Sequence, residues 1–81
     1  MVAGVSLKGR KVAVLGANAS GIALVKFLLK KGAVVKLVDM RSKEVVEPIV
    51  AEVLDPTRYT LECGEFTAQT FADLNQVVLT P

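Results

Sequence analysis

Residues 11–41 read KVAVLGANASGIALVKFLLKKGAVVKLVDMR, and this stretch decides the fold. It opens with a short apolar run at 11–15, passes through a turn with two glycines into an amphipathic segment, and ends after a second apolar run. A strand, a glycine turn, a helix and a second strand form one βαβ unit, the building block of nucleotide-binding folds. We therefore predict that the remaining residues flank this unit or add strands to its sheet.

The turn of this unit has the pattern G-x-N-x-x-G, with Gly16 and Gly21 outside and Asn18 between them. A dinucleotide-binding turn has a third glycine where Asn18 stands, which lets the backbone approach a pyrophosphate. Gly16 permits the tight turn, and Gly21 lets the helix lie close to the sheet. Because the first N–H groups of a helix attract anions, we expect a phosphate near Ala19, Ser20 and Gly21, in a pose unlike that of NAD.

The segment that follows predicts a helix at about 20–31, ended by Gly32, and then a buried strand at 33–38. Asp39 comes next, 18 residues after Gly21. An acidic residue about 20 positions after the glycine turn commonly hydrogen-bonds the ribose of a bound nucleotide. Asp39 is therefore a candidate ligand-reading carboxylate, and its structural alternative is to cap the strand or pair with a nearby Arg or Lys.

The rest of the chain predicts further alternation of helices and strands. We expect residues 42–46 to be irregular, a helix at 47–54 with Pro48 in its first turn, a strand at 58–63, a short helix at 67–74 and a strand at 76–80. The apolar residues expected to pack inward from these helices are Ile49, Val50, Val53, Leu54, Phe71 and Leu74, and Thr67 is the candidate N-cap of the short helix. The prediction is an α/β, Rossmann-like three-layer fold with a mainly parallel sheet of about four strands, incomplete at its C-terminus.

Composition limits the possible classes. The 81 residues suffice for one domain, and 52% hydrophobic with 22% charged residues indicates a globular chain. No apolar run reaches the roughly 18 residues that span a bilayer, and the N-terminus lacks the core of a signal peptide. The single Cys63 excludes an internal disulfide, so we expect a cytoplasmic protein. Histidine is absent, which excludes a catalytic triad with an imidazole base and a histidine-ligated metal site.

Charge is unevenly distributed along the chain. Residues 1–43 contain nine basic residues and one acidic residue, a net charge of +8, whereas residues 44–81 contain one basic and seven acidic residues, a net charge of −6. The plain interpretation is a set of solvated helix faces, and the alternative is attraction of an anionic ligand to the first half. Nucleic acid is a poor fit, because no aromatic residues are interleaved with the basic ones.

The residues KVAVLG, SGIALVKFLLKKGAVV, Asp39, Arg41, a Gly-Glu after the third predicted strand, and VVLTP at 77–81 together resemble the start of the Mur ligases. Within that family the chain is most similar to the branch that adds D-glutamate to UDP-N-acetylmuramoyl-L-alanine. The resemblance covers nearly the whole chain but only the first third of such an enzyme. It implies that residues 1–81 are a single N-terminal domain of a three-domain, ATP-dependent ligase of peptidoglycan synthesis.

The resemblance also implies roles for individual residues. Ala19, Ser20 and Gly21 match the loop near the ribose and diphosphate of the UDP substrate, and Asp39, Met40 and Arg41 match the segment that meets the uracil. Thr80 and Pro81 match the start of a loop that donates backbone groups to the diphosphate. ATP, Mg and D-glutamate would be held by the two domains that follow, so no catalytic residue and no metal ligand is expected here.

Two departures from the family pattern are Asn18, in place of a glycine, and the absence of the glycine expected after Pro81. Two other functions therefore stay open at this point. The chain could be the NAD-binding domain of a dehydrogenase, or a non-catalytic interaction module. A bare edge strand would also favour a homodimer of the 81-residue chain.

Overall fold

The computed structural model describes residues 7–79, and its four strands form one parallel sheet in the order β3-β2-β1-β4. The strands are β1 (Lys11–Leu15), β2 (Val34–Asp39), β3 (Thr60–Cys63) and β4 (Gln76–Leu79). Because all three pairs are parallel, the carboxyl ends of the strands lie along one edge of the sheet. The predicted Rossmann-like α/β fold is confirmed.

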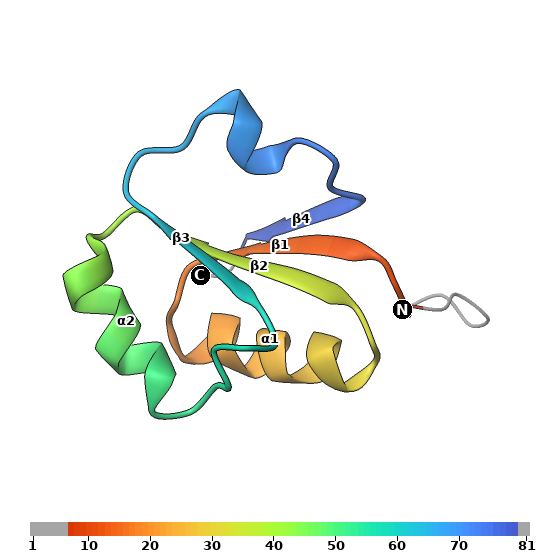
Figure 1. Ribbon diagram of the computed structural model, residues 1–81, viewed down its shortest axis with the longest axis horizontal. Coiled ribbons are helices and arrows are strands. Elements are labelled where there is room, and N and C mark those ends of the chain that lie inside the picture. The colour runs from red at the N-terminus through yellow and green to blue at the C-terminus, as the bar shows by residue number, and fades with distance from the viewer. Residues whose placement is uncertain (1–6, 80–81) are drawn as a thin grey trace.

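Two helices and one short turn connect the strands. Helices α1 (Ala19–Lys30) and α2 (Lys43–Ala51) lie on one side of the sheet, and the connection from β3 to β4 crosses the other side (Figure 1). That connection contains a single turn of 3₁₀ helix, η1 (Ala68–Phe71). The third layer of the fold is therefore thin, and it leaves Val34, Val77 and Leu79 on that face 55%, 44% and 75% exposed.

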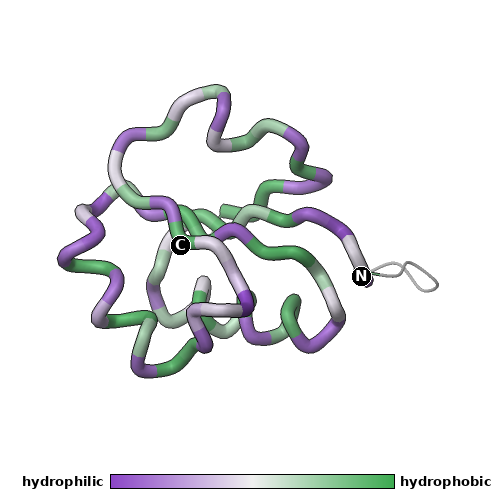
Figure 2. Tube along the Cα trace, in the orientation of Figure 1, coloured by the Kyte–Doolittle hydropathy of each residue, from purple (hydrophilic) through white to green (hydrophobic). Residues whose placement is uncertain are grey.

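The core lies between the sheet and the two helices. It is made of aliphatic side chains that alternate along β1 and β2 and face the buried stripes of α1 and α2. In Figure 2 hydrophobic and hydrophilic positions alternate along α2, as expected for a helix with one buried face. The largest fully buried side chains are Val12, Val14, Val25, Leu37, Val38, Val46 and Val50.

Helix α1 ends as predicted. Gly32 has a φ of 85°, the left-handed conformation that favours glycine. Its N–H donates to the Leu29 carbonyl at 3.1 Å, and the Ala33 N–H donates to the Leu28 carbonyl at 3.0 Å. These two bonds form a Schellman motif, which satisfies the last carbonyls of the helix and turns the chain back into β2.

The prediction for the second helix was wrong at both ends. Helix α2 begins at Lys43 with Ser42 as its N-cap, and it ends at Ala51, so residues 42–46 are not irregular and Pro48 lies inside the helix. Pro48 has no N–H to donate to the carbonyl of Glu44, four residues earlier, but Glu44 is exposed, so water can satisfy that carbonyl.

The earlier start also changes which face of this segment is buried. Val46, Val50 and Leu54 are buried, as expected for positions four residues apart along one face of a helix. Ile49 and Val53, predicted to point inward, are 42% and 46% exposed. Sequence pattern alone did not distinguish the two faces, because both carry aliphatic side chains.

The predicted helix at 67–74 was also too long. Thr67 caps η1 as predicted, since its hydroxyl accepts from the Gln69 N–H at 3.2 Å. Asp73 has a φ of 63°, which a continuing helix does not allow. Phe71 and Leu74 are only partly buried and lie outside the core; Phe71 instead packs edge-to-face on Phe66, with ring centroids 5.7 Å apart.

The remaining boundaries differ from the prediction by two residues or fewer. The third strand starts at Thr60 rather than at 58, and the second is shifted by one residue to include Asp39. In the described part of the chain neither helix is long and apolar enough to cross a membrane.

The buried stripe of α2 can be tested by a pair of substitutions. Val50→Ala should lower the free energy of unfolding by about 2 kcal/mol, because it removes two methyl groups from a fully buried site. Ile49→Ala removes more side chain from a largely exposed site and should cost under about 1 kcal/mol. Urea denaturation of both variants measures the difference, and a larger loss for Ile49→Ala would contradict this assignment of the helix face.

Candidate ligand site at the carboxyl edge of the sheet

The chain changes direction next to β1, which places a crevice at the carboxyl edge of the sheet. It proceeds from β1 outward to β2 and β3, then returns to β4 on the other side of β1. In open α/β sheets, ligands bind at the carboxyl edge where the strand order reverses in this way. The residues that follow β1 and β2 are therefore the first place to look for a ligand site.

Gly16 forms the turn after β1 as predicted. Its φ is 108°, a conformation that side chains disfavour, and its N–H donates to the Val38 carbonyl at 2.8 Å. This bond extends the ladder between β1 and β2 by one residue. The chain then leaves the sheet and enters α1 within three residues.

Asn18 is the N-cap of α1, a role that the sequence analysis missed. Its side-chain oxygen accepts from the Gly21 N–H at 2.8 Å, and its backbone is extended, with a φ of −99°. Asn is among the best N-cap residues, so its place three positions before Gly21 was the signal that could have identified it. Ser20 is the second residue of the helix.

The cap changes which groups can bind an anion. Of the three residues predicted to lie near a phosphate, Gly21 is buried and its N–H is bonded to Asn18. Ala19 and Ser20 are exposed in the first turn. The first intrahelical bond runs from the Ile22 N–H to the Asn18 carbonyl, so the N–H groups of Ala19 and Ser20 remain at the positive end of the helix.

Asp39 is the buried polar centre of the site. Its side chain is 8% exposed, and it bridges the end of β2 to the turn after β1. One oxygen, Oδ2, accepts from the Ala17 N–H at 2.8 Å and from the Arg41 Nη2 at 2.9 Å. The other oxygen, Oδ1, accepts from the Arg41 N–H and from Arg41 Nε, both at 2.9 Å.

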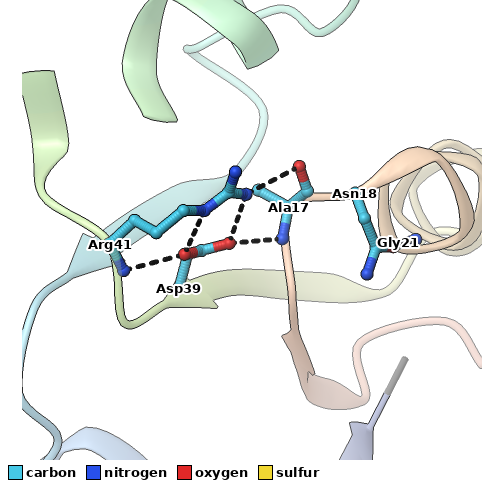
Figure 3. A network of polar contacts seen from close by, with 5 residues as sticks. All are labelled: Ala17, Asn18, Gly21, Asp39 and Arg41. Atoms are coloured by element: carbon cyan, nitrogen blue, oxygen red, sulfur yellow. Dashed lines mark hydrogen bonds and ion pairs between the residues drawn. The ribbon is translucent and has the colours of Figure 1, made fainter. Parts of the chain in front are cut away.

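Arg41 forms a two-pronged ion pair with Asp39, which Figure 3 shows reaching back toward Ala17. Its Nη2 also donates to the Ala17 carbonyl at 3.4 Å. The Arg41 side chain is 49% exposed, so one side of the guanidinium faces solvent. This pairing is the structural alternative that the sequence offers for Asp39.

A small apolar pocket of about 250 Å³ adjoins the carboxylate. Met40, 75% exposed, stands at its rim, and Phe66 contributes a ring from the connection after β3. No local motif in the sequence marks Phe66, because the chain fold alone brings it to this edge. The pocket is lined by Leu15, Gly16, Val38, Asp39, Met40 and Phe66.

The structure thus gathers most of the predicted site residues at one edge of the sheet. Ala19, Ser20 and Gly21 begin α1, and Asp39 and Arg41 lie against the turn that precedes it. Thr80 and Pro81 lie outside the described residues. The binding roles of all these residues remain predictions.

Removing the cap tests the role of Asn18. Asn18→Ala should lower the free energy of unfolding by about 1 kcal/mol, because the Gly21 N–H loses its acceptor. The matched variant Ser20→Ala, two residues further along, should change the free energy of unfolding by less than about 0.5 kcal/mol. Thermal denaturation of the two variants decides the point: an equal loss in both would mean that Asn18 is not the effective cap.

The acid response of stability tests the role of Asp39. The hydrogen bonds from the Arg41 side chain hold the pKa of Asp39 well below its ordinary value; backbone N–H groups of Ala17 and Arg41 add to this effect, and burial opposes it. A carboxyl group whose pKa is lower in the folded state stabilises the fold above its unfolded pKa of about 4 and loses that contribution as pH falls.

Asp39→Asn should therefore cost about 2 kcal/mol at pH 7, and the gap to wild type should narrow below pH 4. Urea denaturation of both proteins at several pH values from 7 to 2 measures this difference in the free energy of unfolding. The pKa values of Asp55 and Glu62 are also lowered, chiefly by hydrogen bonds from the hydroxyl groups of Thr57 and Thr70. Because both proteins contain these two groups, the difference between the proteins gives the contribution of Asp39 alone. A gap that stays constant with pH would contradict an ionised, paired Asp39.

Comparison with known proteins places this chain in a family. Residues 10–81 match the family model described as Mur ligase MurD-like, N-terminal domain. The chain is 35% identical over 75 residues to a UDP-N-acetylmuramoylalanine--D-glutamate ligase of Geobacter sp. (strain M21), and 35% identical over 77 residues to one of Desulfosudis oleivorans. These alignments cover 93% and 95% of this chain but only 16% and 17% of the relatives.

A solved structure resembles the fold. The chain superposes on SirC, a precorrin-2 dehydrogenase, with a TM-score of 0.70 and 18% sequence identity, over 99% of this chain and 38% of that one. At this identity the likeness supports the fold alone. The match of the family model over residues 10–81 goes further: the chain belongs to the MurD-like N-terminal domain family of the Mur ligases.

Proposed function

We propose that this chain binds the uridine diphosphate end of UDP-N-acetylmuramoyl-L-alanine, as the N-terminal domain of a ligase that adds D-glutamate to that substrate. The observation that carries the proposal is the family match over residues 10–81, together with relatives named as UDP-N-acetylmuramoylalanine--D-glutamate ligases. Through that reaction the parent protein would act in peptidoglycan synthesis, and so in cell shape and cell division, in the cytoplasm.

The carboxyl edge of the sheet has groups suited to each part of a uridine diphosphate. The N–H groups of Ala19 and Ser20, at the positive end of α1, can donate to phosphate oxygens. The carboxylate of Asp39 can accept from the imide N–H of uracil, and the pocket beside it offers apolar walls to the ring. The excess of basic residues in 1–43 would attract the doubly charged diphosphate.

The chemistry of the parent enzyme would lie outside this domain. In the proposed reaction, ATP phosphorylates the substrate carboxylate to an acyl phosphate, and the amine of D-glutamate then displaces the phosphate to form the amide. ATP, Mg and D-glutamate would be held by the two following domains. This chain would contribute substrate binding and orientation, so we expect no ligase activity from the 81 residues alone.

The exposed outer strand of the sheet is relevant to the predicted homodimer. Val77 and Leu79 on the outer strand β4 are 44% and 75% exposed. An uncovered apolar edge strand favours self-association, so a homodimer of the 81-residue chain remains our prediction, open to sedimentation analysis.

Calorimetric titration of the 81-residue chain tests the proposal. UDP-N-acetylmuramoyl-L-alanine should bind with a measurable heat, and NADH at equal concentration should not, because the Asn18 side chain stands where a dinucleotide-binding turn has its middle glycine. Phosphate release in the presence of ATP and D-glutamate should stay at background. Preference for NADH would instead favour a dehydrogenase domain, and binding of neither would favour an interaction module.

A further inference from the structure

The hydrogen-bond capacity of the Asp39 carboxylate is fully used within the chain. Two carboxylate oxygens offer about four acceptor positions. All four are occupied: two by the backbone N–H groups of Ala17 and Arg41, and two by the Nε and Nη2 groups of the Arg41 side chain. A ligand N–H therefore cannot reach Asp39 unless one of these donors leaves.

Only one of the two kinds of donor is free to leave. The backbone N–H groups belong to the turn after β1 and to the bend after β2, so moving them would disturb the sheet edge. The Arg41 guanidinium is held by its bonds to the Asp39 carboxylate and to the Ala17 carbonyl, and the Arg41 side chain is 49% exposed, so it can turn toward solvent while the backbone stays in place. Rotation of this one side chain frees one acceptor position on each oxygen.

The guanidinium also lies beside the place where an anion would bind. Its Nη2 is 3.4 Å from the carbonyl of Ala17, which directly precedes the cap of α1. A phosphate on the first N–H groups of α1 would therefore offer Arg41 a second, more highly charged partner close to Asp39. The Asp39 carboxylate and a phosphate at the start of α1 would thus compete for the Arg41 guanidinium.

We propose that Arg41 is a latch on Asp39 that the diphosphate of the ligand releases, so that phosphate binding opens the acceptors that read the base. In the free chain Arg41 keeps the buried carboxylate paired. In the complex Arg41 turns to the phosphates, and Asp39 accepts from the N–H of a planar imide base. This inference rests on the proposed function, since it concerns how the same site takes a uridine diphosphate.

Binding measurements with uridine and with UDP separate recognition of the base from recognition of the diphosphate, because uridine lacks the diphosphate. In Arg41→Met the latch is absent, so uridine should bind roughly fivefold more tightly than to wild type, because it no longer competes with the guanidinium. UDP should lose the contact between Arg41 and phosphate, so its advantage over uridine should shrink. Lys43→Met is the matched control: it removes an equal charge two residues away, from a side chain that pairs with Glu47 at 3.5 Å, and should leave the ratio of the two affinities unchanged.

The outcomes separate the latch from the function on which it rests. If wild type binds UDP but Arg41→Met binds uridine no more tightly, the latch is wrong and the proposed function stands. If neither protein binds UDP, both are wrong. A second measurement, on the wild type, holds even if Arg41→Met folds poorly: the NMR signal of the Arg41 Nε–H should shift when UDP saturates the chain, and an unchanged signal would overturn the latch.

Discussion

The structure depends on one buried carboxylate that joins two consecutive strands at their carboxyl ends. Asp39 is the last residue of β2, and its oxygen accepts from the Ala17 N–H in the turn that follows β1. The bond fixes the turn relative to the sheet just before α1 begins. Burial of a lone carboxylate would be costly, and Arg41 offsets that cost with a two-pronged ion pair. The same group therefore serves the fold and the candidate site.

This dual use limits what the site can do in the free chain. A carboxylate that holds the turn is rigid and well placed, but its acceptors are already committed. The cap on α1 has a similar consequence, since Asn18 satisfies the Gly21 N–H that a diphosphate would otherwise use. Stability and the proposed ligand binding thus draw on the same few polar groups. A ligand must displace at least one internal partner to be recognised at Asp39.

The open face of the sheet shows how thinly the rest of the domain is covered. The connection between β3 and β4 is held to the sheet by a polar group of contacts, in which Lys36 donates to Thr70 and pairs with Glu62. The chain spans 16% and 17% of the lengths of the two curated relatives named above. Val34 and Leu79, on that face, are 55% and 75% exposed.

The sequence by itself determined the βαβ unit, the parallel sheet and the position of Asp39 at the carboxyl end of the second strand, because these follow from local apolar runs, two glycines and their spacing. It did not determine the face of α2, since aliphatic residues occupy both sides of that segment and packing in the core selects Val46 and Val50. Nor did it determine the partners of Asp39. Those depend on how the turn after β1 meets the end of β2, and a contact between residues 22 positions apart is decided only when the strands pair.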